Sequence, residues 1–221
     1  MPEGKPKFHF KVPEYRQALS KPANLILQAG AIAGRLAMEN RTLVKHVDGR
    51  SENVAEHSHM LARIGLVVAP ELYPHLDIGL VVSYATVHDD IEAYILDTAT
   101  HDFSEELHRE KESLEDEGLR QLLIEYEHIP GYARLVLTYA EQIVPEARFV
   151  RVLDKLMPTI VHFNQGGETL KSYRSREALS ARVASKTSIR TEKLLQQYPE
   201  YEALIAIREE LIALSLSELY E

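Results

Sequence analysis

The segment LVVSYATVHDDIE, residues 80–92, is apolar along one helical face and then places four ionisable residues in its last five positions. His88 follows Val81 and Tyr84 at spacings of seven and four, and Glu92 comes one helical turn later. Charged groups at the edge of an apolar core are unfavourable unless something compensates them. A divalent cation is a common partner for a carboxylate beside an imidazole. The segment therefore predicts a buried helix with a metal-binding group at its end.

A second segment, ENVAEHSHML at residues 52–61, has the same character. His57 shares a helical face with Val54 and Leu61, so it is expected to point into the core. His59 lies about 200° further round the helix and is expected to face elsewhere. Taken alone, His57 could equally be a buried histidine bonded to a carbonyl group.

A third segment, FVRVLDKLMP at residues 149–158, places one acid in an apolar helix. Asp154 lies four residues after Val150, and a surface carboxylate paired with Arg151 or Lys155 would also explain it. Pro158 cannot donate a hydrogen bond to the Asp154 carbonyl, so a kink is expected at this position. Considered together, the three segments predict one mixed nitrogen and oxygen metal site, formed by His57, His88, Asp89 and Asp154.

Helical periodicity extends over most of the chain, and no strand alternation, repeat or low-complexity linker stands out. The fold class is therefore predicted to be all-α. We expect an N-terminal arm at 1–20, a core at 21–168, and accessory helices of the same domain at 169–221. The expected helices cover 23–39, 52–69 with Ser51 as cap, 74–96, 104–127, two short stretches after Pro130 and Pro145, 176–198 and 199–220.

The composition excludes several classes of function. The chain has 221 residues, a net charge of −9 and no Cys. Disulfides, thiolate zinc sites and a Cys nucleophile are thereby ruled out. The acidic balance argues against a nucleic-acid binder. No apolar run approaches the roughly 18 residues needed to span a bilayer, and residues 1–11 lack the apolar core of a secretory signal, so we expect a cytoplasmic protein without membrane contact.

The order His57, His88-Asp89, Asp154 resembles the H…HD…D signature of the HD-domain metal-dependent phosphohydrolases. The stretch ENVAEHS at 52–58 is similar to a helix of the bacterial YfbR-type 5′-deoxynucleotidases, and the resemblance covers about residues 38–162. It implies a single-domain HD-type helical bundle, a nucleotide substrate and a homodimer. It also implies one divalent metal ion bound by the four predicted ligands, and imidazole with carboxylate ligation suits Mn, Co, Zn, Fe or Ni and allows Mg.

The resemblance also implies roles for residues around the metal. Glu92 and Asp97 stand where that branch places its catalytic carboxylates, and Arg41 resembles its phosphate-contacting arginine. Arg50 and Lys155 are weaker candidates for substrate binding, because ordinary surface roles also explain them. The implied reaction is release of phosphate from (deoxy)nucleoside 5′-monophosphates by metal-activated water.

Two departures from that branch leave other functions open. Thr42 stands where the branch usually has Trp after the arginine, and the loop after Asp97 lacks the usual Pro and Lys. A deoxynucleoside triphosphate triphosphohydrolase, like phage dATPases on this fold, is therefore an alternative. A di-iron oxygenase is a second alternative, for which His59 or His162 would have to supply a further ligand. A helical module without catalysis is a third.

Overall fold

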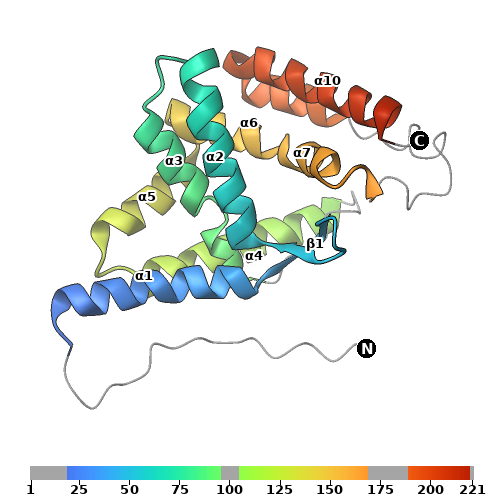
Figure 1. The fold of residues 1–221 in the computed structure, drawn as a ribbon. Helices are drawn as coiled ribbons and strands as arrows, with labels where there is room; N and C mark the ends of the chain where they lie inside the picture. Colours follow the sequence, from blue (N-terminus) through green and yellow to red (C-terminus); the bar gives the residue numbers. More distant parts are fainter. Residues whose placement is uncertain (1–18, 96–104, 169–188, 220–221) are drawn as a thin grey trace.

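Helix α2, Val54–Leu72, runs through the middle of the molecule, with α1 along one side and α10 along the opposite side (Figure 1). The structure is a computed structural model that describes residues 19–95, 105–168 and 189–219. The predicted arm therefore lies almost entirely outside the described residues, as does much of the predicted helix at 176–198. Its described part is helical over 189–197.

The described residues confirm the all-α fold class. The elements are α1 Lys21–Met38, β1 Asn40–Lys45, β2 Ser51–Asn53, α2 Val54–Leu72, α3 Ile78–Val87, the 3-10 helix η1 Asp90–Ala93, α4 Glu105–Glu125, α5 Pro130–Glu141, α6 Pro145–Asp154, α7 Met157–Asn164, the 3-10 helix η2 Pro199–Tyr201 and α10 Glu202–Glu218. Among these residues, no helix has both the length and the apolar character that crossing a bilayer requires.

The strands β1 and β2 form a short antiparallel hairpin that the sequence did not predict. The hairpin changes the start of α2, because Ser51 lies in β2 and the helix begins at Val54, two residues later than expected. Asn53 caps α2 by accepting a hydrogen bond from the Glu56 backbone N–H, and the Glu56 carboxylate accepts one from the Asn53 N–H. The prediction that Ser51 caps this helix is therefore wrong.

Helix α3 is shorter than the single helix expected over 74–96. The α-helix ends at Val87, and Asp89 has φ −111° and ψ 16°, outside α-helical geometry. In a continuous α-helix, consecutive side chains diverge by about 100°. The break frees His88 and Asp89 from that constraint, and it places Glu92 on η1 rather than on the helix that precedes His88.

The kink expected near Pro158 is a full break between two helices. Helix α6 ends at Asp154, and α7 begins at Met157 with Pro158 in its first turn. Proline is tolerated there because the first amides of a helix have no intrahelical acceptor. The break leaves Asp154 at the last position of a buried helix.

The core consists of two groups of buried side chains. The larger group joins α2, α3 and α6 to the C-terminal helix, and includes Leu61, Val81, Phe149, Leu153, Leu204 and Ile205. The smaller joins α1 and α4 to the start of α2, and includes Ile32, Leu36, Val54, Val87, Leu122 and Tyr126. Burial of these side chains holds α2, α3 and α6 together at the point where the predicted ligands lie.

Gly65 makes the close packing of α2 on α3 testable. A Cβ atom at this position would lie 2.9 Å from Val81 Cγ1 and 3.7 Å from Leu153 Cδ2. We expect Gly65→Ala to lower the free energy of unfolding by about 1–3 kcal/mol, because Val81 is branched at Cβ and cannot move freely. Gly34→Ala in α1 is the matched control, since nothing lies within 4 Å of its added Cβ. It should stabilise the protein by about 0.5–1 kcal/mol. Urea unfolding gives the free energy of unfolding of both variants. Equal changes in this free energy would contradict the close packing at Gly65.

Candidate metal centre

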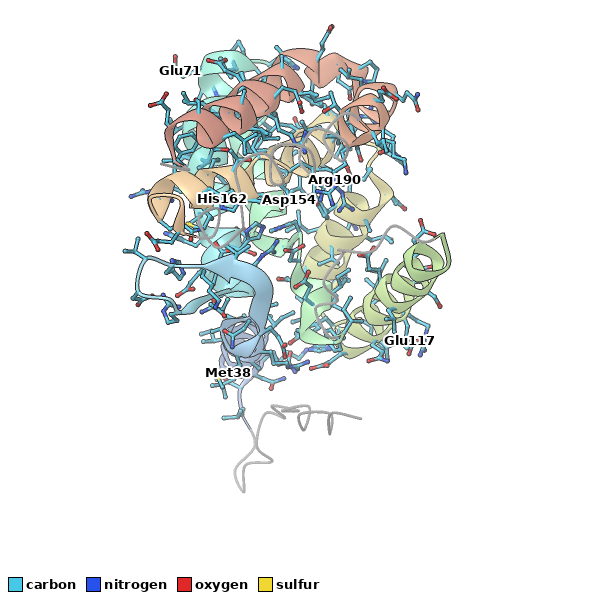
Figure 2. The ribbon with its side chains drawn as sticks, turned by 90° about the vertical axis from the view of Figure 1, so that its right-hand side faces the viewer. Met38, Glu71, Glu117, Asp154, His162 and Arg190 are labelled. Atoms are coloured by element: carbon cyan, nitrogen blue, oxygen red, sulfur yellow. The ribbon has the colours of Figure 1, made fainter. Side chains whose placement is uncertain are left out.

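Three side chains from separate helices converge at the centre of the fold. His57 of α2, His88 at the end of α3 and Asp154 of α6 each offer one ligand atom, and these atoms lie within 4.8 Å of one another. His57 Nε2 lies 3.0 Å from Asp154 Oδ1, and His88 Nε2 lies 3.9 Å from the same oxygen. In Figure 2, Asp154 lies near the middle of the molecule. The sequence had predicted that these three residues meet.

Asp89, the fourth predicted ligand, also reaches the cluster. Its Oδ2 lies 3.1 Å from His88 Nε2 and 3.8 Å from His57 Nε2. The same oxygen accepts a hydrogen bond from Arg41 Nη1 at 2.9 Å. Asp89 therefore faces the imidazoles and a guanidinium group at once. Its role as a metal ligand stays a prediction.

The orientation of His88 fits metal coordination. Its Nδ1 lies 2.9 Å from the Ala85 carbonyl oxygen, which can only accept a hydrogen bond. Nδ1 therefore carries the proton, and the lone pair of the neutral ring lies on Nε2. Among the described residues, this buried nitrogen has no hydrogen bond of good geometry, although Asp89 Oδ2 lies 3.1 Å away. A buried acceptor without a donor is unfavourable, and a cation at this position would satisfy it.

The two oxygens of Asp154 face different charges. Oδ1 points to His57, while Oδ2 accepts a hydrogen bond from Lys155 Nζ at 2.6 Å. Lys155 is therefore in direct contact with the cluster. The sequence analysis had named it as a candidate for substrate binding. Its side chain is 44% exposed, so the ammonium group also faces solvent. Lys155 leaves one Asp154 oxygen available to the centre of the site.

Nearby positive charges keep the carboxylates of Asp154 and Asp89 ionised. Burial disfavours the charged form of Asp154, but Lys155 and the two imidazoles outweigh it, so its pKa lies well below the usual range. At Asp89, burial raises the pKa, but the neighbouring His88 lowers it by a larger amount, so this pKa is also lowered. Burial lowers the pKa of His88, but Asp89 and Asp154 raise it by a larger amount, so a bound metal ion would compete with a proton for Nε2. The carboxylates therefore remain anionic, as metal binding requires.

Arg41 lies beside the cluster, and the hairpin places it there. Its guanidinium group contacts Asp89 through Nη1 and lies 3.5 Å from Glu52 Oε2 through Nε. Burial lowers its pKa, but the carboxylates around it, led by Asp89 and Asp154, raise it above the ordinary value. Arg41 is thus a permanent cation next to the predicted ligands. The sequence picked out the residue but not the hairpin that positions it.

The other predicted residues are placed less directly. Glu92 is half-buried on η1, and its charge contributes to the environment of Arg41. Arg50 is more than half exposed and pairs with Glu56 at 2.8 Å, not with a residue of the cluster. Asp97 lies outside the described residues. His59 is exposed on α2, as its helical position predicted.

Glu52 is a member of the site that the sequence analysis missed. It lies on β2, its side chain is 1% exposed, and Oε2 lies 3.7 Å from His57 Nδ1. Burial raises its pKa, while His57 and Arg41 act in the opposite direction. A signal was present, since Glu52 opens the segment ENVAEHS. Helical periodicity, however, says nothing about a residue in a strand.

The protein thus combines an all-α fold with a candidate metal centre, in which buried imidazoles and carboxylates lie beside cations. The residues fit a divalent ion, because His57, His88 and Asp154 supply the nitrogen and oxygen donors that transition metals favour. Sequence comparison places the chain in a family, since the model described as HD domain matches residues 33–198. The chain belongs to the HD-domain family.

One solved structure supports the fold. A protein of Magnetospirillum magnetotacticum MS-1, described as a predicted metal-dependent phosphohydrolase, superposes with a TM-score of 0.64 at 24% identity. The match covers 92% of this chain and 98% of that one. A conserved hypothetical protein of Pyrococcus furiosus matches with a TM-score of 0.49 at 27% identity, over 79% of this chain and 99% of that one. Comparison with curated proteins gives no match.

Metal binding can be measured without a substrate. We expect added Mn²⁺ to raise the thermal unfolding midpoint, because an ion that binds only the folded state stabilises it by mass action, by about 2.7 kcal/mol at 100 times its Kd. His57→Ala should abolish this shift, since it removes one of the three convergent donors. His59→Ala on the same helix is the matched control, because His59 is exposed. A full Mn²⁺ shift in His57→Ala would contradict the site.

Proposed function

We propose that this protein is a divalent-metal-dependent phosphohydrolase that releases orthophosphate from a nucleoside 5′-monophosphate. The observation that carries the proposal is the position of Arg41, whose guanidinium group lies 2.9 Å from Asp89 at the edge of the His57, His88 and Asp154 cluster. A metal centre with a cation beside it suits an anionic substrate that is attacked by water. The description of the Magnetospirillum protein supports the same class.

The residues divide into three parts. His57, His88 and Asp154 would bind the ion, with Asp89 as the proposed fourth ligand. When bound, the ion would act as a Lewis acid that activates water and neutralises charge on the phosphoryl group. Arg41 presents a planar set of N–H donors that matches phosphate oxygens, and Asp89 orients it through Nη1. Substrate binding and hydrolysis would thus use different side chains.

Proton transfer falls to carboxylates in this proposal. Glu92 lies in the same electrostatic environment as Arg41 and is half-buried, so its carboxylate can accept a proton from the attacking water. Asp97 is the proposed acid that protonates the leaving 5′-oxygen. Lys155 is the second cation of the site, and it balances the charge of Asp154.

The monophosphate is proposed because the segment 52–58 resembles the YfbR-type 5′-deoxynucleotidases. Thr42, in place of the usual Trp, keeps the triphosphohydrolase as the second candidate. The products separate the two functions. The first yields nucleoside and orthophosphate, and the second yields nucleoside and inorganic triphosphate.

The deciding experiment incubates the protein with ribo- and deoxynucleoside mono- and triphosphates, each with Mn²⁺, Co²⁺ or Mg²⁺. We expect orthophosphate from monophosphates, and Glu92→Gln should lower turnover by about 10²–10⁴-fold while Mn²⁺ binding is retained, because a general base is lost. Glu71→Gln is the control, since Glu71 is exposed and lies at the edge of the molecule far from Asp154 (Figure 2). Absence of every phosphate product with every metal would disprove the enzyme assignment.

The role of Arg41 has its own test. Arg41→Ala should lower kcat/KM by an amount equivalent to about 2–4 kcal/mol, since a charge-assisted contact to the transferring phosphoryl group is lost. Arg63→Ala is the matched control, because Arg63 is an exposed arginine of α2. Steady-state kinetics on the best nucleotide measure both. Equal activity of the two variants would show that Arg41 does not bind the phosphate.

A further inference from the structure

We propose that Glu52 is a positioning residue that holds the metal ligand His57 and the guanidinium group of Arg41 in register with each other. The His57 part depends only on the metal centre. The Arg41 part rests on the proposed function, because there Arg41 binds phosphate.

The geometry places Glu52 between these two residues. It lies on β2 immediately before the cap of α2, so the strand that carries it runs directly into the helix that carries His57. Its Oε2 lies 3.7 Å from His57 Nδ1 and 3.5 Å from Arg41 Nε. One carboxylate oxygen therefore faces the outer nitrogen of a predicted metal ligand and the proposed phosphate clamp at the same time.

Burial of this carboxylate is unfavourable for the fold. The side chain is 1% exposed, and neither Oε1 nor Oε2 has a hydrogen-bond partner among the residues that the structure describes. A buried charge of this kind costs several kcal/mol unless nearby positive groups compensate it. The groups that face it are His57 and Arg41, both of which belong to the site. Stability alone would favour a neutral residue here, so the charge is better explained by the site.

The charge acts on the tautomer of His57. In His88, the Ala85 carbonyl oxygen fixes the proton on Nδ1 and leaves the lone pair on Nε2. In His57, the group facing Nδ1 is the Glu52 carboxylate. Without an ion, His57 Nε2 faces Asp154 Oδ1 at 3.0 Å and shares a proton with it. Once an ion takes the place of that proton, the negative charge of Glu52 would hold the remaining proton on Nδ1 and leave the Nε2 lone pair for the ion. Outer carboxylates of this type orient histidine ligands in many metal proteins.

The first arm of the test uses Mn²⁺ alone. Glu52→Gln keeps the size of the side chain and removes its charge. We expect its affinity for Mn²⁺, measured by isothermal titration calorimetry, to fall by about 10–100-fold. The metal-free variant should unfold at the same temperature as the wild type or higher, because an uncompensated buried charge has been removed. Wild-type Mn²⁺ affinity would overturn the proposal, and so would weaker binding that comes with clear destabilisation, which a merely structural role would produce.

Glu146→Gln is the matched control for this arm. Glu146 is also a buried glutamate, but it accepts a hydrogen bond from the Asp77 backbone N–H at the N-terminal end of α3. His88 follows the opposite end of the same helix. The control should lose stability and keep its Mn²⁺ affinity. If Glu52→Gln does not fold, Glu52→Asp replaces it, since the shorter side chain withdraws the charge from His57 and should also weaken Mn²⁺ binding; unchanged affinity in Glu52→Asp would overturn the proposal.

The second arm tests the link to Arg41 with inorganic phosphate as the probe. In Mn²⁺-saturated protein, Glu52→Gln should weaken phosphate binding, and it should have much less effect when Arg41→Ala is already present. Additive effects of the two substitutions would overturn the Arg41 part. The Mn²⁺ arm remains measurable if no phosphate ester is hydrolysed, so failure of the proposed function and failure of this inference are distinguishable.

Discussion

The contact between His57 Nε2 and Asp154 Oδ1, at 3.0 Å, is the interaction on which the site depends. It joins residues 97 positions apart in the sequence, so it exists only when α2 and α6 are correctly packed. The larger core supplies that packing, since Leu61, Val81 and Leu153 come from α2, α3 and α6. Polar groups placed among such side chains must compensate one another, because water does not reach them. The core therefore fixes where the polar side chains lie, and their burial requires that opposite charges lie next to one another.

Charge compensation at the site is directional. Asp154 faces His57 through Oδ1 and Lys155 through Oδ2. In Asp89, the same oxygen, Oδ2, faces both His88 and Arg41. These cations prevent repulsion between the carboxylates without occupying the space between His57 and His88. That space is where a divalent ion would add the most favourable interactions.

The sequence predicted the parts of this site that follow helical periodicity. His57 and Asp154 are interpretable because a polar residue on an apolar helical face must point inward. Helical periodicity did not predict where α3 ends. The backbone conformation of Asp89 accompanies its contacts with His88 and with Arg41, which is 48 residues away in the sequence. The six-residue strand β1 was missed because NRTLVK lacks regular alternation. Glu52 was missed with it, since its importance appears only once β2 brings it beside His57.

The elements that carry the predicted metal ligands and the element that carries Arg41 differ in kind. His57, His88 and Asp154 come from helices held by a common core, whereas Arg41 comes from a short hairpin at the start of α2. Changes in the hairpin can alter what binds beside the ion without disturbing the helices, because surface connections tolerate change better than packed cores. The predicted ligands and the neighbouring cation therefore lie on separate parts of the fold. Thr42, at which the chain departs from the YfbR-type pattern, lies in β1 of this hairpin and not in the helices that carry His57, His88 and Asp154.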